Sequence, residues 1–170
     1  SLENSWMNGP CFDLSALDRP MISLDYWSDL ESQLDGVVLQ YSLDGGISWF
    51  NVGTGDSPSA GINWFNSSNI VGKPGIQLIG DYGWSGNEVK GWQNGRFNLD
   101  MIDPAKRNQV RIRIAIGSSN DNIPNITFDG FAFDNVYVGE KQRNVLIEHF
   151  TNSGIPVNGE AYLNTLYDNQ

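Results

Sequence analysis

The chain has 170 residues, of which 39% are hydrophobic, 12% aromatic and 18% charged. This composition is too apolar for a disordered segment and too poor in charges for a coiled coil, and the length suits one domain of ordinary size. The formal net charge of −10 argues against a nucleic-acid partner, and the lack of any apolar run of about 18 residues argues against membrane insertion.

Short candidate strands separated by turn-forming residues begin near residue 21. Residues 21–27 and 36–43 are predicted strands, and in the second the odd positions from 37 to 43 are all apolar and share one face. Residues 47–52 follow across a tight turn that contains Gly45 and Gly46. This arrangement predicts a β-hairpin.

A long irregular stretch covers residues 56–90 and is rich in glycine and aromatic residues. A loop of this length is uncommon as a passive connection in a compact domain. We expect either a binding loop or a flap that its aromatic side chains pack over one sheet.

The second half of the chain contains the clearest alternation of apolar and polar residues. In residues 110–116 the apolar side chains point one way, and Arg111 and Arg113 point the other. Residues 128–138 form a last predicted strand, in which a change of parity indicates a bulge near Asp134-Asn135. Strands, glycine-rich turns and no intervening helices predict an all-β antiparallel sandwich or barrel.

A polar segment near residue 140 marks a domain boundary, which divides the chain into residues 1–139 and 140–170. In the second part, residues 145–150 are a predicted strand and residues 158–167 a predicted helix with Asn158 as its N-cap. Because one strand and one helix cannot bury a core, we expect this tail to begin a truncated second domain or to lie against the sandwich.

The chain contains one cysteine and one histidine, Cys11 and His149. A single cysteine forms no internal disulfide and no zinc site of its own. Serine–histidine or cysteine–histidine catalysis would depend on the only imidazole of the chain, so an enzyme of those classes is not expected.

Residues 42–49, Ser-Leu-Asp-Gly-Gly-Ile-Ser-Trp, match the Asp-box pattern S-x-D-x-G-x-[ST]-W at every fixed position. Asp-boxes recur once per blade in sialidase-type propellers, whereas this chain has one copy and is too short for a propeller. Asp44, Gly46 and Trp49 are therefore predicted to stabilise a turn and to have no catalytic role.

Six segments are informative through their order and spacing, namely residues 11–15, 22–27, 35–49, 91–99, 110–116 and 129–136. Together they resemble the MAM-like, cleaved-adhesin-like modules of secreted bacterial proteins. This resemblance implies a two-sheet, concanavalin-like jelly roll that acts as a non-catalytic accessory module. Its expected role is adhesion, or binding of protein or glycan at a cell or matrix surface, next to other domains of a secreted or cell-surface bacterial protein whose signal peptide is absent here.

The same resemblance implies a structural Ca²⁺ ion held by Glu31, Asp35 and Asp134, with Asp29 as a further candidate. Ca²⁺ accepts six to eight oxygen ligands, which strands distant in sequence can supply. The alternative is that Asp35 caps a turn and that Asp134 holds the bulge by accepting hydrogen bonds from backbone amides.

The alternative function is a carbohydrate-binding module, in which Trp64, Tyr82, Trp84 and Trp92 form a platform for sugar stacking. The competing interpretation is that these aromatic residues fill the core. A glycoside hydrolase, built on a carboxylate pair such as Asp29 and Glu31, is the less favoured third hypothesis.

The tail has a resemblance of its own. Residues 145–152 resemble the first strand of thioredoxin-like domains in secreted bacterial proteins, which usually continue into a C-x-x-C pair. Residues 153–157 contain no cysteine, so no redox activity is expected.

Overall fold

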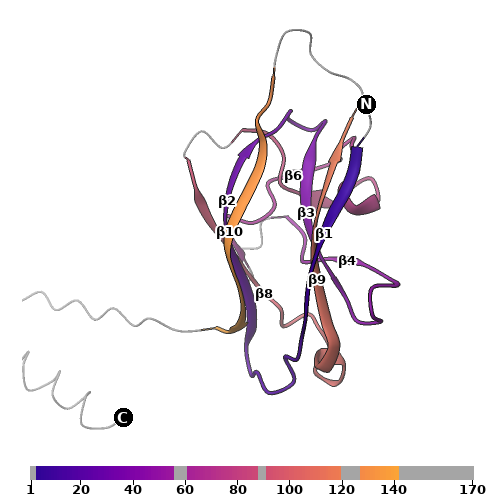
Figure 1. Ribbon diagram of the computed structural model, residues 1–170, viewed down its shortest axis with the longest axis vertical. Coiled ribbons are helices and arrows are strands. Elements are labelled where there is room, and N and C mark those ends of the chain that lie inside the picture. The colour runs from indigo at the N-terminus through magenta and orange to yellow at the C-terminus, as the bar shows by residue number, and fades with distance from the viewer. Residues whose placement is uncertain (1–2, 56–60, 88–90, 120–126, 142–170) are drawn as a thin grey trace, which may run out of the picture.

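The computed structural model describes residues 3–55, 61–87, 91–119 and 127–141. Two antiparallel four-stranded sheets face each other in this part of the chain (Figure 1). The prediction of an all-β antiparallel sandwich is confirmed, and the sheets do not close into a barrel.

The consecutive strands β1, β2 and β3 alternate between the two sheets, as strands do in a jelly roll. The first sheet has the order β1 (Glu3–Phe12), β9 (Val110–Ser118), β3 (Gly36–Ser42), β4 (Phe50–Asn51). The second has the order β10 (Gly130–Glu140), β2 (Pro20–Asp29), β8 (Gln93–Asn98), β5 (Gly61–Ile62). Smaller elements are β6 (Ser67–Ser68) paired with β7 (Tyr82–Gly83), and the 3₁₀ helices η1 (Pro74–Ile76) and η2 (Pro104–Gln109).

Strand burial follows the position of each strand in the sandwich. Along β2 buried and half-buried residues alternate from end to end, as expected for a strand with one face in the core. Strand β3 is buried on both faces, because the segment around η1 packs on the outer face of the first sheet. A Cβ at Gly117 would overlap the backbone of Gly72, so glycine at both positions permits this close packing.

An aromatic cluster fills the core between the sheets. Trp64 and Phe65 pack against Trp84 with ring centroids 4.9 and 4.8 Å apart, and Trp64 also contacts Phe97 of β8 at 5.2 Å. The described part of the long irregular stretch, residues 61–87, therefore packs as a flap, which is one of the two arrangements expected from its aromatic residues.

The predicted bulge in the last strand is confirmed. The register between β10 and β2 shifts between Asp134 and Tyr137, and Asn135 has a φ of +51°. The side chain of Asn135 donates a hydrogen bond to Asp25 of β2 at 2.8 Å, which ties the bulge to its neighbour.

Several predictions lie outside the described residues. These include the strand at 145–150, the helix at 158–167 and therefore the separate domain expected after residue 140. Among the residues that are described, no helix is long and apolar enough to cross a membrane.

Candidate binding sites

The Asp-box forms a self-contained turn before β4. One carboxylate oxygen of Asp44 accepts hydrogen bonds from the Ser42 hydroxyl at 2.8 Å and from the backbone amide of Ser48 at 2.9 Å. The indole of Trp49 donates to the carbonyl of Gly46, whose φ is +99°. The amide of Ser48 and then the hydroxyl of Ser42 lower the pKa of Asp44 to about 2. All of these hydrogen bonds are made within the Asp-box itself, and they stabilise its turn.

Two of the predicted calcium ligands are engaged elsewhere. Asp29 accepts hydrogen bonds from the Asn87 side chain at 2.7 Å and from the backbone amide of Asp129 at 3.0 Å. Asp134 accepts from the amide of Asn135 at 2.7 Å, as the bulge-holding alternative predicts. In the register of β10 with β2, Asp134 lies opposite Asp25. Because Asp25 is four residues before Asp29, Asp134 lies about 13 Å from Asp29 along the strand.

Glu31 and Asp35 share one turn after β2, in which the amide of Asp35 donates to the carbonyl of Glu31 at 2.9 Å. Asp35 also accepts a hydrogen bond from the amide of Ser119 at 3.0 Å, which holds the end of β9. Glu31 is only 5% exposed, and its Oε1 is buried with no hydrogen-bond partner among the described residues. A buried carboxylate oxygen is unfavourable unless a donor or a cation meets it.

The prediction that these four carboxylates form one calcium site needs a correction. Within the described ranges no three acidic, histidine or cysteine side chains come close enough to hold a metal ion. Of the four carboxylates, only Glu31 has a buried oxygen without a hydrogen-bond partner among the described residues. Glu31 is also too buried to act as one acid of a pair that flanks an open sugar groove.

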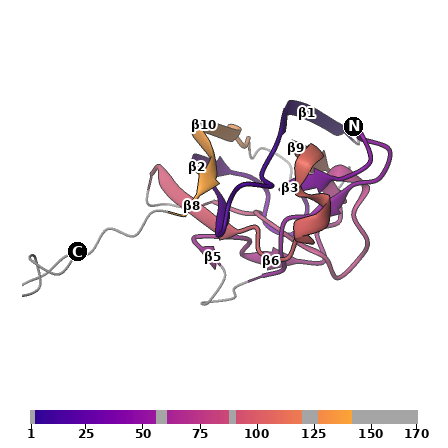
Figure 2. The ribbon, with the colours of Figure 1, turned by 90° about the horizontal axis from the view of Figure 1, so that it is seen from below.

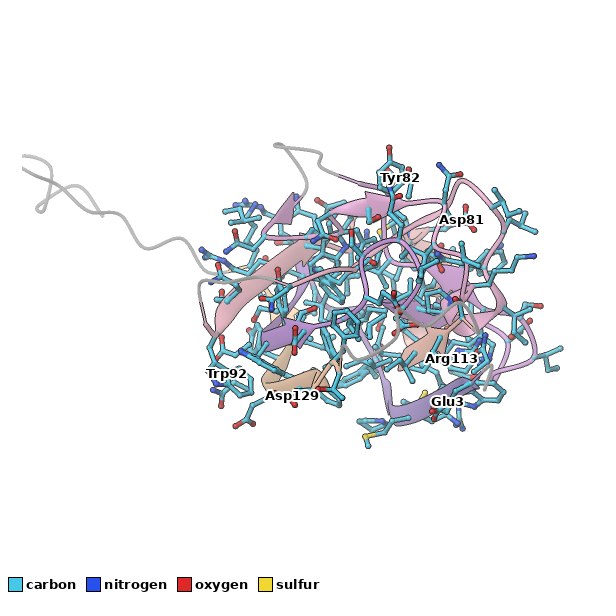
Figure 3. All side chains as sticks on the ribbon, turned by 90° about the horizontal axis from the view of Figure 1, so that it is seen from above. Glu3, Asp81, Tyr82, Trp92, Arg113 and Asp129 are labelled. Carbon is cyan, nitrogen blue, oxygen red and sulfur yellow. The ribbon has the colours of Figure 1, made fainter. Side chains whose placement is uncertain are left out.

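The predicted aromatic platform needs a correction too. Trp64 and Trp84 are 2% and 1% exposed, so neither presents a face to a ligand. Trp92 and Tyr82 are exposed, but Figure 3 shows them on different sides of the molecule, Tyr82 at the top and Trp92 at the lower left. The indole of Trp64 donates to the carbonyl of Val52 at 2.8 Å, which fixes it in the core.

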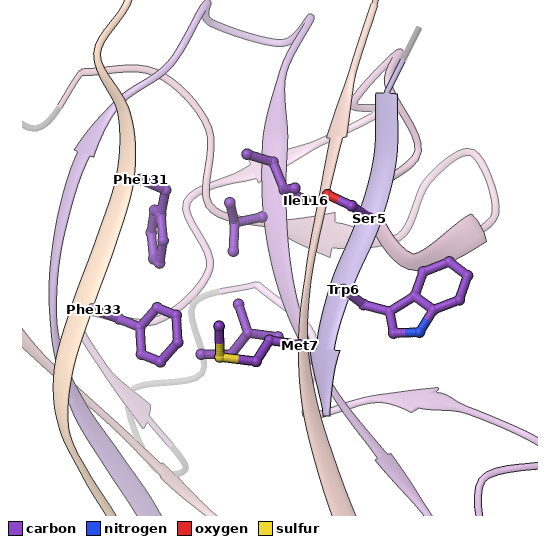
Figure 4. A pocket seen from close by; sticks show the side chains of 8 residues that line it. Ser5, Trp6, Met7, Ile116, Phe131 and Phe133 are labelled. Carbon is purple, nitrogen blue, oxygen red and sulfur yellow. The ribbon is translucent and has the colours of Figure 1, made fainter. Parts of the chain in front are cut away.

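Strands β1 and β10 are the outermost strands on one side of the two sheets (Figure 2). An open apolar groove runs between them. Its upper part, about 260 Å³, is lined by Met7 of β1, Ile116 of β9 and the rings of Phe131 and Phe133 of β10. Figure 4 shows these rings facing Ile116 and Met7, whereas Trp6 points away from them. A lower part of about 160 Å³ continues towards Val138.

Exposed apolar side chains extend the groove to the surface. Met7 is 64% exposed, and Val136 on β10 is also exposed. The sequence patterns predict neither β1 nor this groove. The signal in the sequence was the apolar content of residues 128–138. When such a strand lies at the edge of a sheet, its one neighbouring strand cannot cover all of its apolar side chains.

The fold and the groove define a class: an antiparallel β-sandwich that is open along one edge. No protein-family model matches the chain, and comparison with curated proteins gives no match.

Proposed function

We propose that the chain is a non-catalytic binding or adhesion module of a secreted or cell-surface protein, and that it binds an extended segment of a partner polypeptide along the groove between β1 and β10. The observation that carries this proposal is the apolar groove between two strand edges, neither of which pairs with a further strand in the described part of the chain.

The two edges determine the chemistry of the occupant. An edge strand presents backbone N–H and C=O groups that a further strand satisfies, which is the basis of recognition by strand addition. Between the edges lie half-buried apolar side chains, including Phe131, Phe133 and Ile114. A segment that satisfies both needs is an extended strand with apolar residues at alternate positions, which directs its side chains into the groove.

Calcium has a place in this proposal as a structural ion. We place it at the turn that contains Glu31 and Asp35, because the unpartnered Glu31 oxygen is buried there. When bound, a cation would neutralise that carboxylate and hold the turn against the end of the flap. The hydroxyl of Ser85 already links the two, since it donates to the carbonyl of Asp35 at 2.6 Å.

The binding proposal is tested by selecting displayed random peptides of about eight residues, the length of an ordinary strand, against the protein. We expect enriched peptides to carry apolar residues at alternate positions. The variant Met7→Asp places a charge in the groove, and we expect it to bind these peptides at least about tenfold more weakly. Because Met7 is largely exposed, this change should leave folding intact.

The matched control is Ile47→Asp, which adds the same charge at a side chain that is 86% exposed on the Asp-box turn. It should bind the enriched peptides as the unmodified protein does. The proposal is wrong if no alternating peptides are enriched, or if they bind Met7→Asp as tightly as the control.

A further inference from the structure

We infer that the protein has a second binding site, on the outer face of the first sheet, which binds a sugar ring through the side-chain amide of Gln77 and the aromatic ring of Tyr82. This site is separate from the groove and goes beyond the function proposed above. It rests on a chain of hydrogen bonds that ends at a donor without an acceptor.

The chain of hydrogen bonds starts at Arg113 of β9. Its Nε donates to Gln40 Oε1 of β3 at 2.8 Å. Gln40 Nε2 donates to Asn51 Oδ1 of β4 at 2.9 Å, and Asn51 Nδ2 donates to Gln77 Oε1 at 3.0 Å. The remaining group, Gln77 Nε2, is buried and has no hydrogen-bond partner among the described residues, although Gln77 is only 6% exposed.

The direction of this chain is set by Arg113. A guanidinium group only donates, so Gln40 must turn its oxygen towards Arg113 and its nitrogen towards Asn51. The same reasoning passes to Asn51 and then to Gln77, because turning any one amide would set two donors or two acceptors against each other. The group at the end of the chain is therefore an N–H donor that needs an acceptor oxygen.

Arg113 is itself held firmly in place. Its guanidinium carbon lies 4.2 Å from the ring centroid of Trp49 and 4.9 Å from that of Trp6, so two indoles enclose it. Its Nη2 also donates to the carbonyl of Gly75 at 3.4 Å. Because the anchor is fixed, the amides that follow it are ordered before any ligand arrives, which lowers the entropy lost on binding.

Gln77 lines a hollow of about 460 Å³, a volume typical of small-ligand sites. Phe50 and Tyr82, both exposed, line it. Asp81 lines it too, and its Oδ2 accepts a hydrogen bond from the backbone amide of Leu78 at 3.0 Å, which leaves Oδ1 as an acceptor. Figure 3 shows Asp81 and Tyr82 on the same side of the molecule. The hollow thus combines a donor, aromatic faces and a carboxylate acceptor.

This combination selects a sugar over other small ligands. A sugar hydroxyl accepts from an amide N–H and donates to a carboxylate, while the C–H face of the ring stacks on an aromatic side chain. A purely apolar ligand would leave Gln77 Nε2 without an acceptor. An anion would meet Asp81 and a chain whose net charge is −10.

The experiment is a protein-observed NMR titration with a panel of methyl glycosides, which reads the side-chain amide resonances of Gln77 and the ring of Tyr82. We expect at least one glycoside to shift both in a saturable way. Gln77→Glu, which replaces the terminal donor by an oxygen, should weaken binding by about tenfold or more. Tyr82→Ala should weaken it as well.

The matched controls are Gln109→Glu, which makes the same change at an exposed glutamine of η2, and Tyr137→Ala, which removes an exposed ring from β10. Both should bind the glycoside unchanged, and so should Met7→Asp, which separates this site from the groove. If no glycoside shifts Gln77, or if Gln77→Glu binds as tightly as Gln109→Glu, the proposal is overturned and the hollow holds water alone.

Discussion

The two long sides of the sandwich are built from the same kinds of side chain but differ in what covers them. On one side Trp64 of the flap packs against Phe97 of β8, with Phe65 beside Trp64, and both flap residues are almost completely buried. On the other side Phe131 and Phe133 of β10 are only half-buried, although they belong to the same apolar core. The flap covers the side that contains Phe97. The side that contains Phe131 and Phe133 stays open, and we propose that a partner strand covers it.

The largest expected effect compares the two sides directly. Trp64→Ala removes a buried ring and the hydrogen bond to Val52, and should lower the free energy of unfolding by about 3–5 kcal/mol. Phe133→Ala should cost about 1–2 kcal/mol, because much of this ring already contacts water. Urea unfolding followed by circular dichroism measures both values. Equal losses would show that the open side is as well packed as the closed one; if Trp64→Ala does not fold, Trp64→Phe keeps the comparison usable.

A smaller loss of stability is expected when a Cβ atom is added on the side of the sandwich that the flap covers. Gly53 has a φ of +82°, and a Cβ there would overlap the Phe97 ring, so Gly53→Ala should destabilise the protein by about 2–3 kcal/mol. Gly45 is the matched control, with a φ of +79° and open space around it. Gly45→Ala should cost about 1 kcal/mol, from backbone strain alone. A Gly53→Ala loss no larger than this would contradict the tight packing described for Phe97.

The next prediction concerns the stability that the proposed calcium ion adds at the end of the flap. Calcium at about 100 times its dissociation constant should stabilise the protein by about 2.7 kcal/mol, and EDTA should reverse the gain. Glu31→Gln should abolish the response, whereas Asp134→Asn should keep it, because Asp134 lies on β10 beside Asp25. Thermal melting with and without EDTA measures this response. A melting temperature that EDTA leaves unchanged would remove calcium from the account.

The smallest expected effect concerns the Asp-box, which belongs to neither side. Folding lowers the pKa of Asp44 to about 2, so its carboxylate stabilises the folded state above the unfolded pKa near 3.8. This contribution should be lost as the pH falls from about 4 through about 2. Asp44→Asn should be less stable at neutral pH and should show a weaker loss of stability over that range. NMR titration of Asp44 checks the pKa itself, and an unshifted value would contradict the hydrogen bonding described here.

The strands that the sequence predicts best are those with one face in the core. In residues 21–27 every second side chain is buried. In residues 110–116 the apolar alternation marks the strand in the sequence, although Arg113 on the opposite face is buried as well. Strand β1 was not predicted, since most of its residues are exposed and no alternation marks it. Strand β8 was also missed, because its buried positions are only Gly95 and Phe97.

The candidate sites divide in a similar way. The Asp-box is local, so spacing alone identifies its turn. The amide chain from Arg113 to Gln77 joins residues up to 73 positions apart, and no spacing in the sequence brings them together. Trp64 and Trp84 were predicted either as a sugar platform or as core, and only burial separates these alternatives. Polar networks and edge grooves depend on tertiary packing, which residue patterns do not encode locally.

The proposed function requires an extended strand to bind along the open side of the sandwich. Backbone amide hydrogen exchange of the full chain, measured with and without a peptide enriched in the display experiment, locates such a strand. We expect added protection to be confined to β1 and β10, with β4 and β5 on the far side unchanged. Protection at β4 or β5, or none at the two groove edges, would contradict the claim.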